Sequence, residues 1–259
     1  MVGTAFAGRS SLAASLESRG CRDVTAVSLP GSKGALDGYL AVPDGTGPWP
    51  GVVVIHDTLG MTADLRGQCD WLAGAGFVAV GPDLYSWGRK FSCMRATFSD
   101  LTSRRGRAFD DIDAVRGWLA DRDDCTGRIG VIGYCMGGGF SLLLSVGHDF
   151  SASSVNYGGV PDDAADYLAG ACPIVGSFGA KDRTLKGAAA KLESALRDLD
   201  VAHDVEEYPL VGHSFLNDHQ GGVGVLLKVL GPLMGVGHDS TAVADARARI
   251  EAFFHEHLD

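Results

Sequence analysis

From Pro50 onward the chain alternates short apolar runs with segments of helical spacing, and this alternation limits the folds open to it. The run GVVVIH (51–56) is apolar throughout, as expected of a strand covered on both faces. The segment 64–76 then places apolar residues at helical spacing and ends at glycine. The same unit recurs toward the end of the chain. The sequence therefore predicts an α/β fold, with a mostly parallel central sheet and helices on both faces.

Further elements follow from the same patterns. The strands predicted after the first unit are 77–83, 128–134, 173–179 and 203–208, with a shorter one in 151–159, and the helices are 107–122, 140–146, 185–199 and 246–258. Before Pro50, VTAVSL and GYLAVP predict two antiparallel strands. No linker divides the core, so we expect residues 1–259 to form a single α/β domain. Residues 1–20 are expected to form a short helix or a loose tail, and 217–240 either a flap or a packed connection.

The composition excludes several classes of protein. Apolar residues make up 46% and charged residues 21%, as in ordinary globular proteins. The net charge of −10 argues against nucleic-acid phosphates or anionic membranes as partners. No apolar run approaches the roughly 20 residues of a transmembrane helix. The six cysteines form no CxxC pair and no secretory signal stands out, so we expect no metal site and a cytoplasmic location.

The stretch GYCMGGG (133–139) places a cysteine between a predicted buried strand and a predicted buried helix. Residues 133–137 fit the pattern G-x-nucleophile-x-G of a nucleophile elbow. The helix that follows favours a thiolate at its N-terminus, because its first N–H groups carry partial positive charge. The alternative for Cys135 is a buried structural thiol in a glycine-rich turn. A phosphate loop is disfavoured, since no GK[ST] ending follows.

Two further residues complete a possible triad. Functional groups in open α/β sheets gather at the carboxyl ends of the strands. Asp182 follows the strand 173–179, and His213 follows the strand 203–208. With Cys135 they occur in the order Cys, Asp, His, which is the chain order of the α/β-hydrolase triad. Taken alone, Asp182 could instead cap a helix, and His213 could be a solvated side chain.

The motifs GYCMGG, GHSF, VVVIHDTLG, FVAVGPDLY and FGAKD resemble those of the dienelactone hydrolase family (carboxymethylenebutenolidase-like) of α/β-hydrolases. The resemblance covers about residues 36 to 257. It implies that Cys135 is the nucleophile, His213 the base and Asp182 its orienting acid. It also implies that the backbone N–H groups of Met136 and Thr58 hold the oxyanion.

The resemblance extends to residues around the triad. Asp57, in the segment HDTLG, takes the place of an acidic residue that in the family contacts the resting thiol and modulates its ionisation. Family members that hydrolyse dienelactone hold the substrate carboxylate with two arginines, and this chain has Trp87 and Asn217 at those positions. Losing both bidentate groups predicts altered recognition of the substrate carboxylate. We expect Tyr85, Trp87 and Asn217 to contact the substrate.

These residues predict hydrolysis of a small-molecule ester or lactone through an acyl-enzyme on Cys135. The reaction needs no metal or organic cofactor, and we expect a monomer or a small homo-oligomer. A non-catalytic or sensory α/β-hydrolase domain that binds a small apolar ligand is the alternative, motivated by the lost arginines. A thiol-redox protein is disfavoured, because Cys125 should lie at the opposite end of its strand from Cys135.

Overall fold

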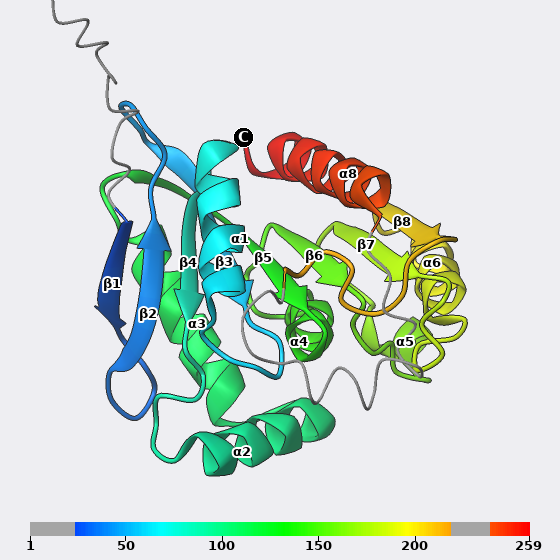
Figure 1. Ribbon diagram of the computed structural model, residues 1–259, viewed down its shortest axis with the longest axis horizontal. Coiled ribbons are helices and arrows are strands. Elements are labelled where there is room, and N and C mark those ends of the chain that lie inside the picture. The colour runs from blue at the N-terminus through cyan, green and yellow to red at the C-terminus, as the bar shows by residue number, and fades with distance from the viewer. Residues whose placement is uncertain (1–23, 219–238) are drawn as a thin grey trace, which may run out of the picture.

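The computed structural model describes residues 24–218 and 239–259, and these build one eight-stranded sheet (Figure 1). Its strand order is β1-β2-β4-β3-β5-β6-β7-β8. The strands are β1 (Val24–Leu29), β2 (Leu36–Ala41), β3 (Trp49–Ile55), β4 (Val78–Pro82), β5 (Cys125–Tyr134), β6 (Ala152–Asn156), β7 (Ile174–Gly179) and β8 (His203–Tyr208). The first two strands are antiparallel to their neighbours, and the other six run parallel. The predicted fold class is confirmed.

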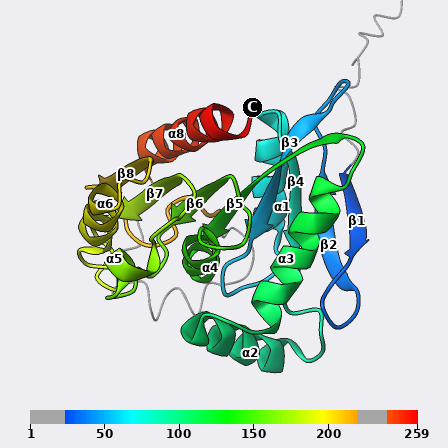
Figure 2. The same cartoon turned by 180° about the vertical axis from the view of Figure 1, so that it is seen from behind.

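Helices cover both faces of the sheet, as Figures 1 and 2 show from opposite sides. One face carries α1 (Ala63–Gly74) and α8 (Ser240–Leu258). The other face carries α2 (Lys90–Ser103), α3 (Arg107–Ala120), α4 (Met136–Leu144), α5 (Ala164–Tyr167) and α6 (Ala188–Asp198). None of the described helices combines the length and the apolar character that crossing a bilayer requires.

The core explains why the strands read as unbroken apolar runs. Residues 52–55 of β3 are fully buried, since α1 covers one face of the strand and α3 covers the other. On the first face Leu72 and Phe254 pack together with other buried side chains, and on the second Ile112 and Phe140 do so. Burying a side chain of this size contributes roughly 1.5–3 kcal/mol. The burial on both sides removes the alternation that a half-exposed strand would show.

The register of the parallel strands brings their carboxyl ends to one edge of the sheet. Ile55 pairs with Gly133, and Tyr134 pairs with Asn156. The residues that follow β3, β5 and β6 therefore emerge beside one another. At Gly137 a Cβ atom would collide with the carbonyl oxygen of Ile55, so glycine allows α4 to start against the end of β3.

The structure differs from the predicted elements in several places: α5 was not predicted, and α4 begins at Met136 rather than at residue 140. The helix α2 was not predicted, and the strand β5 begins at Cys125 rather than at residue 128. The helix predicted from residue 185 begins at Ala188, because Gly187 is left-handed with φ 78°. The last helix begins earlier than predicted, at Ser240, where Asp239 caps it by accepting the N–H of Thr241 at 2.9 Å.

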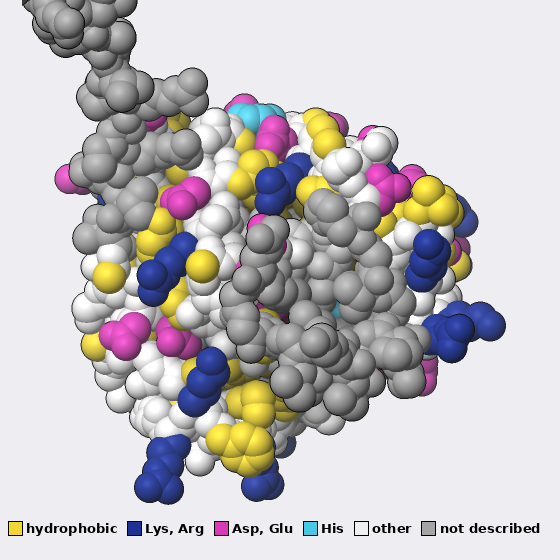
Figure 3. All heavy atoms as spheres, viewed as in Figure 1, with side chains coloured by type: hydrophobic (Ala, Val, Ile, Leu, Met, Phe, Trp, Pro, Cys, Tyr) yellow, Lys and Arg dark blue, Asp and Glu magenta, His cyan; other side chains and the backbone are white. Residues whose placement is uncertain are grey.

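The prediction for residues 1–20 lies outside the described residues, and so does the prediction for 217–240 apart from its first two and last two residues. That residues 1–259 form a single domain stays a prediction. Figure 3 shows acidic and basic side chains interspersed over the face of α1 and α8, and hydrophobic side chains at the surface near α2. On that helix Phe91 is 68% exposed and Phe98 is 39% exposed.

Candidate active site

Cys135 occupies the turn between β5 and α4 with a strained backbone, at φ 56° and ψ −112°. Its N–H donates to the carbonyl oxygen of Asn156 at 3.0 Å, and its carbonyl accepts the N–H of Gly139 at 3.1 Å. A Cβ atom at Gly133 would collide with the carbonyl of Gly137, so the turn depends on both glycines. Left-handed backbone at a non-glycine residue costs of order 1–3 kcal/mol. The turn leaves the thiol partly exposed at the carboxyl edge of the sheet.

Asn156, at the end of β6, supports this turn from the neighbouring strand. Its side-chain amide donates to the carbonyl oxygen of Gly133 at 3.2 Å and to the hydroxyl of Ser154 at 3.1 Å. Together with the backbone bond from Cys135, it holds the segment of chain that leads into the strained residue. The sequence does not predict this role, because no local pattern links residues 133 and 156.

His213 and Asp182 form a buried pair. The Nδ1 atom of His213 lies 2.5 Å from Oδ2 of Asp182, and the two residues are only 6% and 3% exposed. The other carboxylate oxygen accepts the backbone N–H of Thr184 at 2.8 Å and its hydroxyl at 2.6 Å. Burial alone would raise the pKa of Asp182, but the bonds from His213 and Thr184 outweigh it and lower this pKa.

The pKa of His213 depends on burial and on two neighbouring residues, Asp182 and Cys135. Burial lowers its pKa, but the bond to Asp182 and the nearby Cys135 together raise the pKa to about 9. The Nε2 atom is buried and forms no hydrogen bond of ordinary geometry within the described residues. Catalytic hydrogen bonds are often long in a ligand-free site. The structure thus brings Cys135, Asp182 and His213 together.

The two predicted oxyanion donors lie at the ends of neighbouring strands. Among the described residues, neither the N–H of Met136 nor that of Thr58 has a hydrogen-bond acceptor. The N–H of Met136 belongs to the first turn of α4, where helix N–H groups have no acceptor within the helix. The hydroxyl of Tyr85 donates to the carbonyl oxygen of Thr58 at 3.3 Å and lies 3.7 Å from Sδ of Met136. Tyr85 therefore contacts both residues that would supply the donors.

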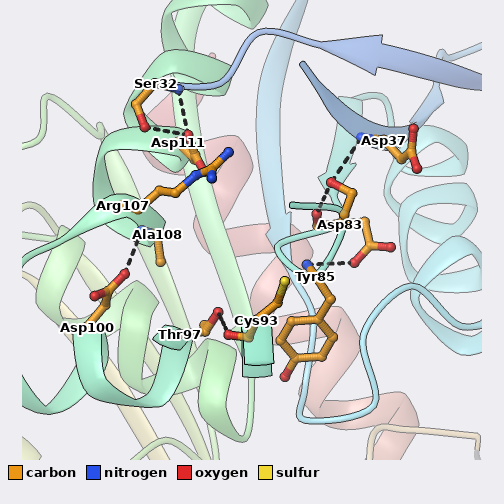
Figure 4. Close-up of polar contacts among 11 residues, drawn as sticks. Ser32, Asp37, Asp83, Tyr85, Cys93, Thr97, Asp100, Arg107, Ala108 and Asp111 are labelled. Atoms are coloured by element: carbon orange, nitrogen blue, oxygen red, sulfur yellow. Dashed lines mark hydrogen bonds and ion pairs between the residues drawn. The ribbon is translucent and has the colours of Figure 1, made fainter. Parts of the chain in front are cut away.

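The loop after β4 fixes the position of Tyr85 (Figure 4). The carboxylate of Asp83 accepts the N–H of Tyr85 at 2.9 Å. The hydroxyl of Ser86 donates to the carbonyl of Asp83 at 2.8 Å and accepts the N–H of Asp37 at 3.3 Å. These bonds tie the loop to itself and to β2. The ring of Tyr85 is only 4% exposed, so its predicted contact with substrate stays a prediction.

Trp87 packs against the core cluster on the face of the sheet that α3 and α4 cover. The guanidinium carbon of Arg107 lies 4.5 Å from the centre of a Trp87 ring. The same arginine pairs with the fully buried Asp111, as Figure 4 shows. The indole N–H of Trp87 is buried and finds no acceptor within the described residues. The role predicted for Trp87 in substrate binding remains untested.

Asp57 caps the loop that carries Thr58. Its carboxylate accepts the backbone N–H of Leu59 at 2.8 Å, and the residue is 7% exposed. Its charge raises the pKa of Tyr85 and of Tyr157, although burial is the larger cause for both. Asp57 therefore lies close enough to both tyrosines for its charge to act on them. That Asp57 modulates the thiol remains a prediction.

Asn217 fastens the loop of His213 to the start of α1. Its side-chain oxygen accepts the hydroxyl of Tyr157 at 2.5 Å, and its amide donates to Asp64 at 2.5 Å. The N–H of Asp218 also donates to Asp64, at 2.6 Å. We refer to Asp64, Tyr157 and Asn217 as the loop clasp. Within the described residues only Asp64 accepts from the amide of Asn217, and the predicted contact with substrate is still a prediction.

Comparison with known proteins identifies the family. The model of the dienelactone hydrolase family matches residues 36–258, which take in every residue of the site described above. The chain belongs to this family. Its members are hydrolases with the α/β-hydrolase fold, and the family resemblance inferred from the sequence is confirmed.

Individual members of the dienelactone hydrolase family are distant from this chain. Proteins from Azospirillum brasilense and Yersinia pestis, both named "Putative carboxymethylenebutenolidase", are 28% and 25% identical to it. The matches cover 91% and 80% of this chain and 100% and 83% of the relatives. A dienelactone hydrolase-like promiscuous phosphotriesterase from metagenomic libraries superposes with a TM-score of 0.77 at 22% identity. That match covers 93% of this chain and all of the other, and it shows the shared fold.

Proposed function

We propose that this protein hydrolyses carboxylic esters or lactones with a triad of Cys135, His213 and Asp182. The observation that carries the proposal is the buried His213–Asp182 pair, joined at 2.5 Å beside the strained turn that displays the thiol. A carboxylate that holds one imidazole nitrogen leaves the other free to exchange protons with a nucleophile. The membership of a hydrolase family supports the same reading.

The reaction would proceed in two stages. The thiolate of Cys135 attacks the ester carbonyl carbon, and the electron pair moves to the carbonyl oxygen, which the N–H groups of Met136 and Thr58 stabilise. The intermediate collapses, its C–O bond breaks, and the His213 imidazolium gives a proton to the departing alcohol. Water then loses a proton to His213 and attacks the thioester, which releases the acid and restores the thiolate.

The charges around the site favour an uncharged acyl group. Asn217 belongs to the loop clasp, and its nearest charged partner is the carboxylate of Asp64 rather than an arginine. Asp57 adds a second negative charge close to Tyr157, which belongs to the same clasp. A substrate carboxylate would meet repulsion where dienelactone-hydrolysing relatives offer arginine. We therefore propose that neutral esters and lactones are the substrates.

Two other functions remain as alternatives. A domain that only binds a small apolar ligand would share the fold but would not acylate Cys135. A thiol-redox function is less well supported, because Cys125 begins β5 and Cys135 follows its other end. All five described cysteines are free thiols. The cytoplasmic location and the monomeric or small homo-oligomeric state stay predictions from composition.

The proposed function is tested with p-nitrophenyl acetate. We expect the wild-type protein to hydrolyse it and to gain an acetyl-sized mass during turnover, while Cys135→Ala does neither. Cys125→Ala is the matched control, since it removes a thiol at the far end of the same strand, and it should keep full activity. Equal rates in wild type and Cys135→Ala, with no adduct on either, would favour the ligand-binding alternative.

A further inference from the structure

His56 directly follows β3, is fully buried, and bonds two different backbone segments. Its Nε2 atom accepts the N–H of Leu84 at 3.2 Å, and its Nδ1 atom lies 2.6 Å from the carbonyl oxygen of Asp57. A backbone N–H can only donate, so Nε2 carries no proton. The proton of the neutral ring is therefore on Nδ1, and it is donated to the carbonyl of Asp57.

That carbonyl shares a peptide unit with the N–H of Thr58, one of the two oxyanion donors of the proposed mechanism. In a planar trans peptide the C=O and the N–H point in opposite directions. A bond that fixes the carbonyl of Asp57 therefore also fixes the direction of the Thr58 N–H. A hydrogen bond to the carbonyl oxygen polarises the unit as well, which makes its N–H a stronger donor.

We propose that His56 is a positioning residue for the oxyanion hole: its Nδ1–H holds the Asp57–Thr58 peptide so that the Thr58 N–H faces the carbonyl oxygen of a bound ester. The proposal rests on the proposed function, since an acyl-transfer site is what uses this donor. His56 touches no substrate and transfers no proton in this role. It acts through one peptide unit.

Neighbouring contacts support this role. The rings of His56 and Tyr85 meet edge to face, with centroids 4.6 Å apart and planes at 63°. Since the hydroxyl of Tyr85 donates to the carbonyl of Thr58, the peptide units on both sides of Thr58 are held by side chains. Burial lowers the pKa of His56, which keeps the ring in the neutral form that this arrangement requires.

The test separates positioning of the donor from general packing. His56→Leu keeps a buried side chain but removes the donor, whereas His56→Asn retains an N–H close to the position of Nδ1. For each variant we would measure kcat and KM with p-nitrophenyl acetate, and the rate at which iodoacetamide alkylates Cys135. Alkylation needs a reactive thiol but forms no oxyanion, so it reports on the thiol and on the fold alone.

We expect His56→Leu to lower kcat by about 10- to 100-fold, somewhat less than the loss of a whole oxyanion donor, with KM and the alkylation rate unchanged. His56→Asn should recover kcat to within a few-fold of wild type. Equal losses of hydrolysis and alkylation in both variants, or an unchanged kcat in His56→Leu, would overturn the proposal.

Nitrogen-15 NMR of the wild-type protein gives a readout that does not depend on turnover. We expect a protonated Nδ1 and an unprotonated Nε2 on His56, and the reverse assignment would overturn the proposal. Failure of the proposed function can be distinguished from failure of the His56 proposal. In the first case the wild-type protein would form no acyl adduct, and both proposals would be wrong. An adduct on wild type with normal kcat in His56→Leu would remove the role of His56 alone.

Discussion

The imidazole of His213 and the carboxylate of Asp182 are held in one relative orientation, because Thr184 donates two hydrogen bonds to the carboxylate oxygen that His213 does not use. The carboxylate cannot rotate away without breaking three bonds in a buried place. Its charge and hydrogen bond, with Cys135 nearby, raise the pKa of His213 to about 9 although burial opposes this. At neutral pH the ring is therefore protonated and can act as the acid for a leaving group.

Replacing Asp182 with asparagine should move the alkaline limb of the pH–rate profile. In wild type, kcat/KM should fall as pH rises through about 9, where His213 loses its proton. Because the bond to Asp182 raises that pKa, Asp182→Asn should shift the limb to lower pH by about 1–3 units. The profile is measured with an alkyl ester over neutral and alkaline pH. A limb that stays in place would show that another group controls it.

The steepness of the alkaline fall in kcat/KM should depend on the leaving group of the ester. An alkoxide leaves poorly unless His213 protonates it, whereas p-nitrophenolate leaves without a proton. On wild-type protein, an alkyl ester and a p-nitrophenyl ester of the same acid should therefore differ, with a steep alkaline fall in kcat/KM for the first and a shallow one for the second. Identical limbs would argue against proton donation by His213 in acylation.

Thr184→Val should weaken the support of the catalytic carboxylate. The lost hydroxyl bond is expected to lower the free energy of unfolding by about 1 kcal/mol at neutral pH. Since the bonds lower the pKa of Asp182, the stability they add is present above its ordinary value of 3.8 and is lost as pH falls through the lower folded value. The difference between variant and wild type in urea unfolding should therefore shrink in acid.

Thr102→Val is the matched control for this change, because that hydroxyl bonds an exposed helix carbonyl, of Phe98 at 2.9 Å. It should alter the free energy of unfolding by less than about 0.5 kcal/mol. A difference for Thr184→Val that does not vary with pH would contradict the role given to this bond.

The loop clasp offers a swap experiment. Asn217→Asp puts a second carboxylate against Asp64 and should cost about 1–3 kcal/mol in the free energy of unfolding, with lower kcat because the loop carries His213. Adding Asp64→Asn exchanges the two groups and restores a donor facing an acceptor. The double variant should recover most of both losses in a double-mutant cycle. Losses that simply add would show that the two side chains do not interact.

Two glycines give opposite expectations for the same substitution. Gly137→Ala places a methyl group against the carbonyl oxygens of Ile55 and His56 and should destabilise the fold by several kcal/mol or prevent folding. Gly67→Ala, inside α1, meets nothing within 4 Å and should stabilise by about 0.5–1 kcal/mol. Thermal unfolding of both variants measures the contrast. A tolerated Gly137→Ala would mean that α4 can shift away from β3.

The sequence predicted the sheet well because burial on both faces leaves a strong local signal. Residues 51–56 could hardly be anything but a covered strand, and the chain order of Cys135, Asp182 and His213 followed from the strands they end. The helix α2 left no such signal. Only two of its residues, Cys93 and Thr97, are buried, and Phe91 and Phe98 face outward, so its sequence lacks an apolar stripe directed at the core.

The supporting bonds of the site could not be read from the sequence at all. Nothing local links His56 to Leu84, Asn156 to Gly133, or Asn217 to Asp64, since each pair meets only when strands and loops are in register. The position of Asn217 after the histidine suggested a substrate contact by analogy with an arginine. Its observed bonds to Asp64 and Tyr157 depend on the placement of α1 and β6, which no spacing reveals.

The backbone at Cys135 sits in a region that glycine adopts freely and other residues resist. Glycine at this position would make the fold more stable, because it adopts this backbone conformation without strain. A descendant that no longer used the thiol would gain stability by drifting to glycine at this position. The identity of this one residue across a lineage is therefore a record of whether selection still acts on the chemistry of the site.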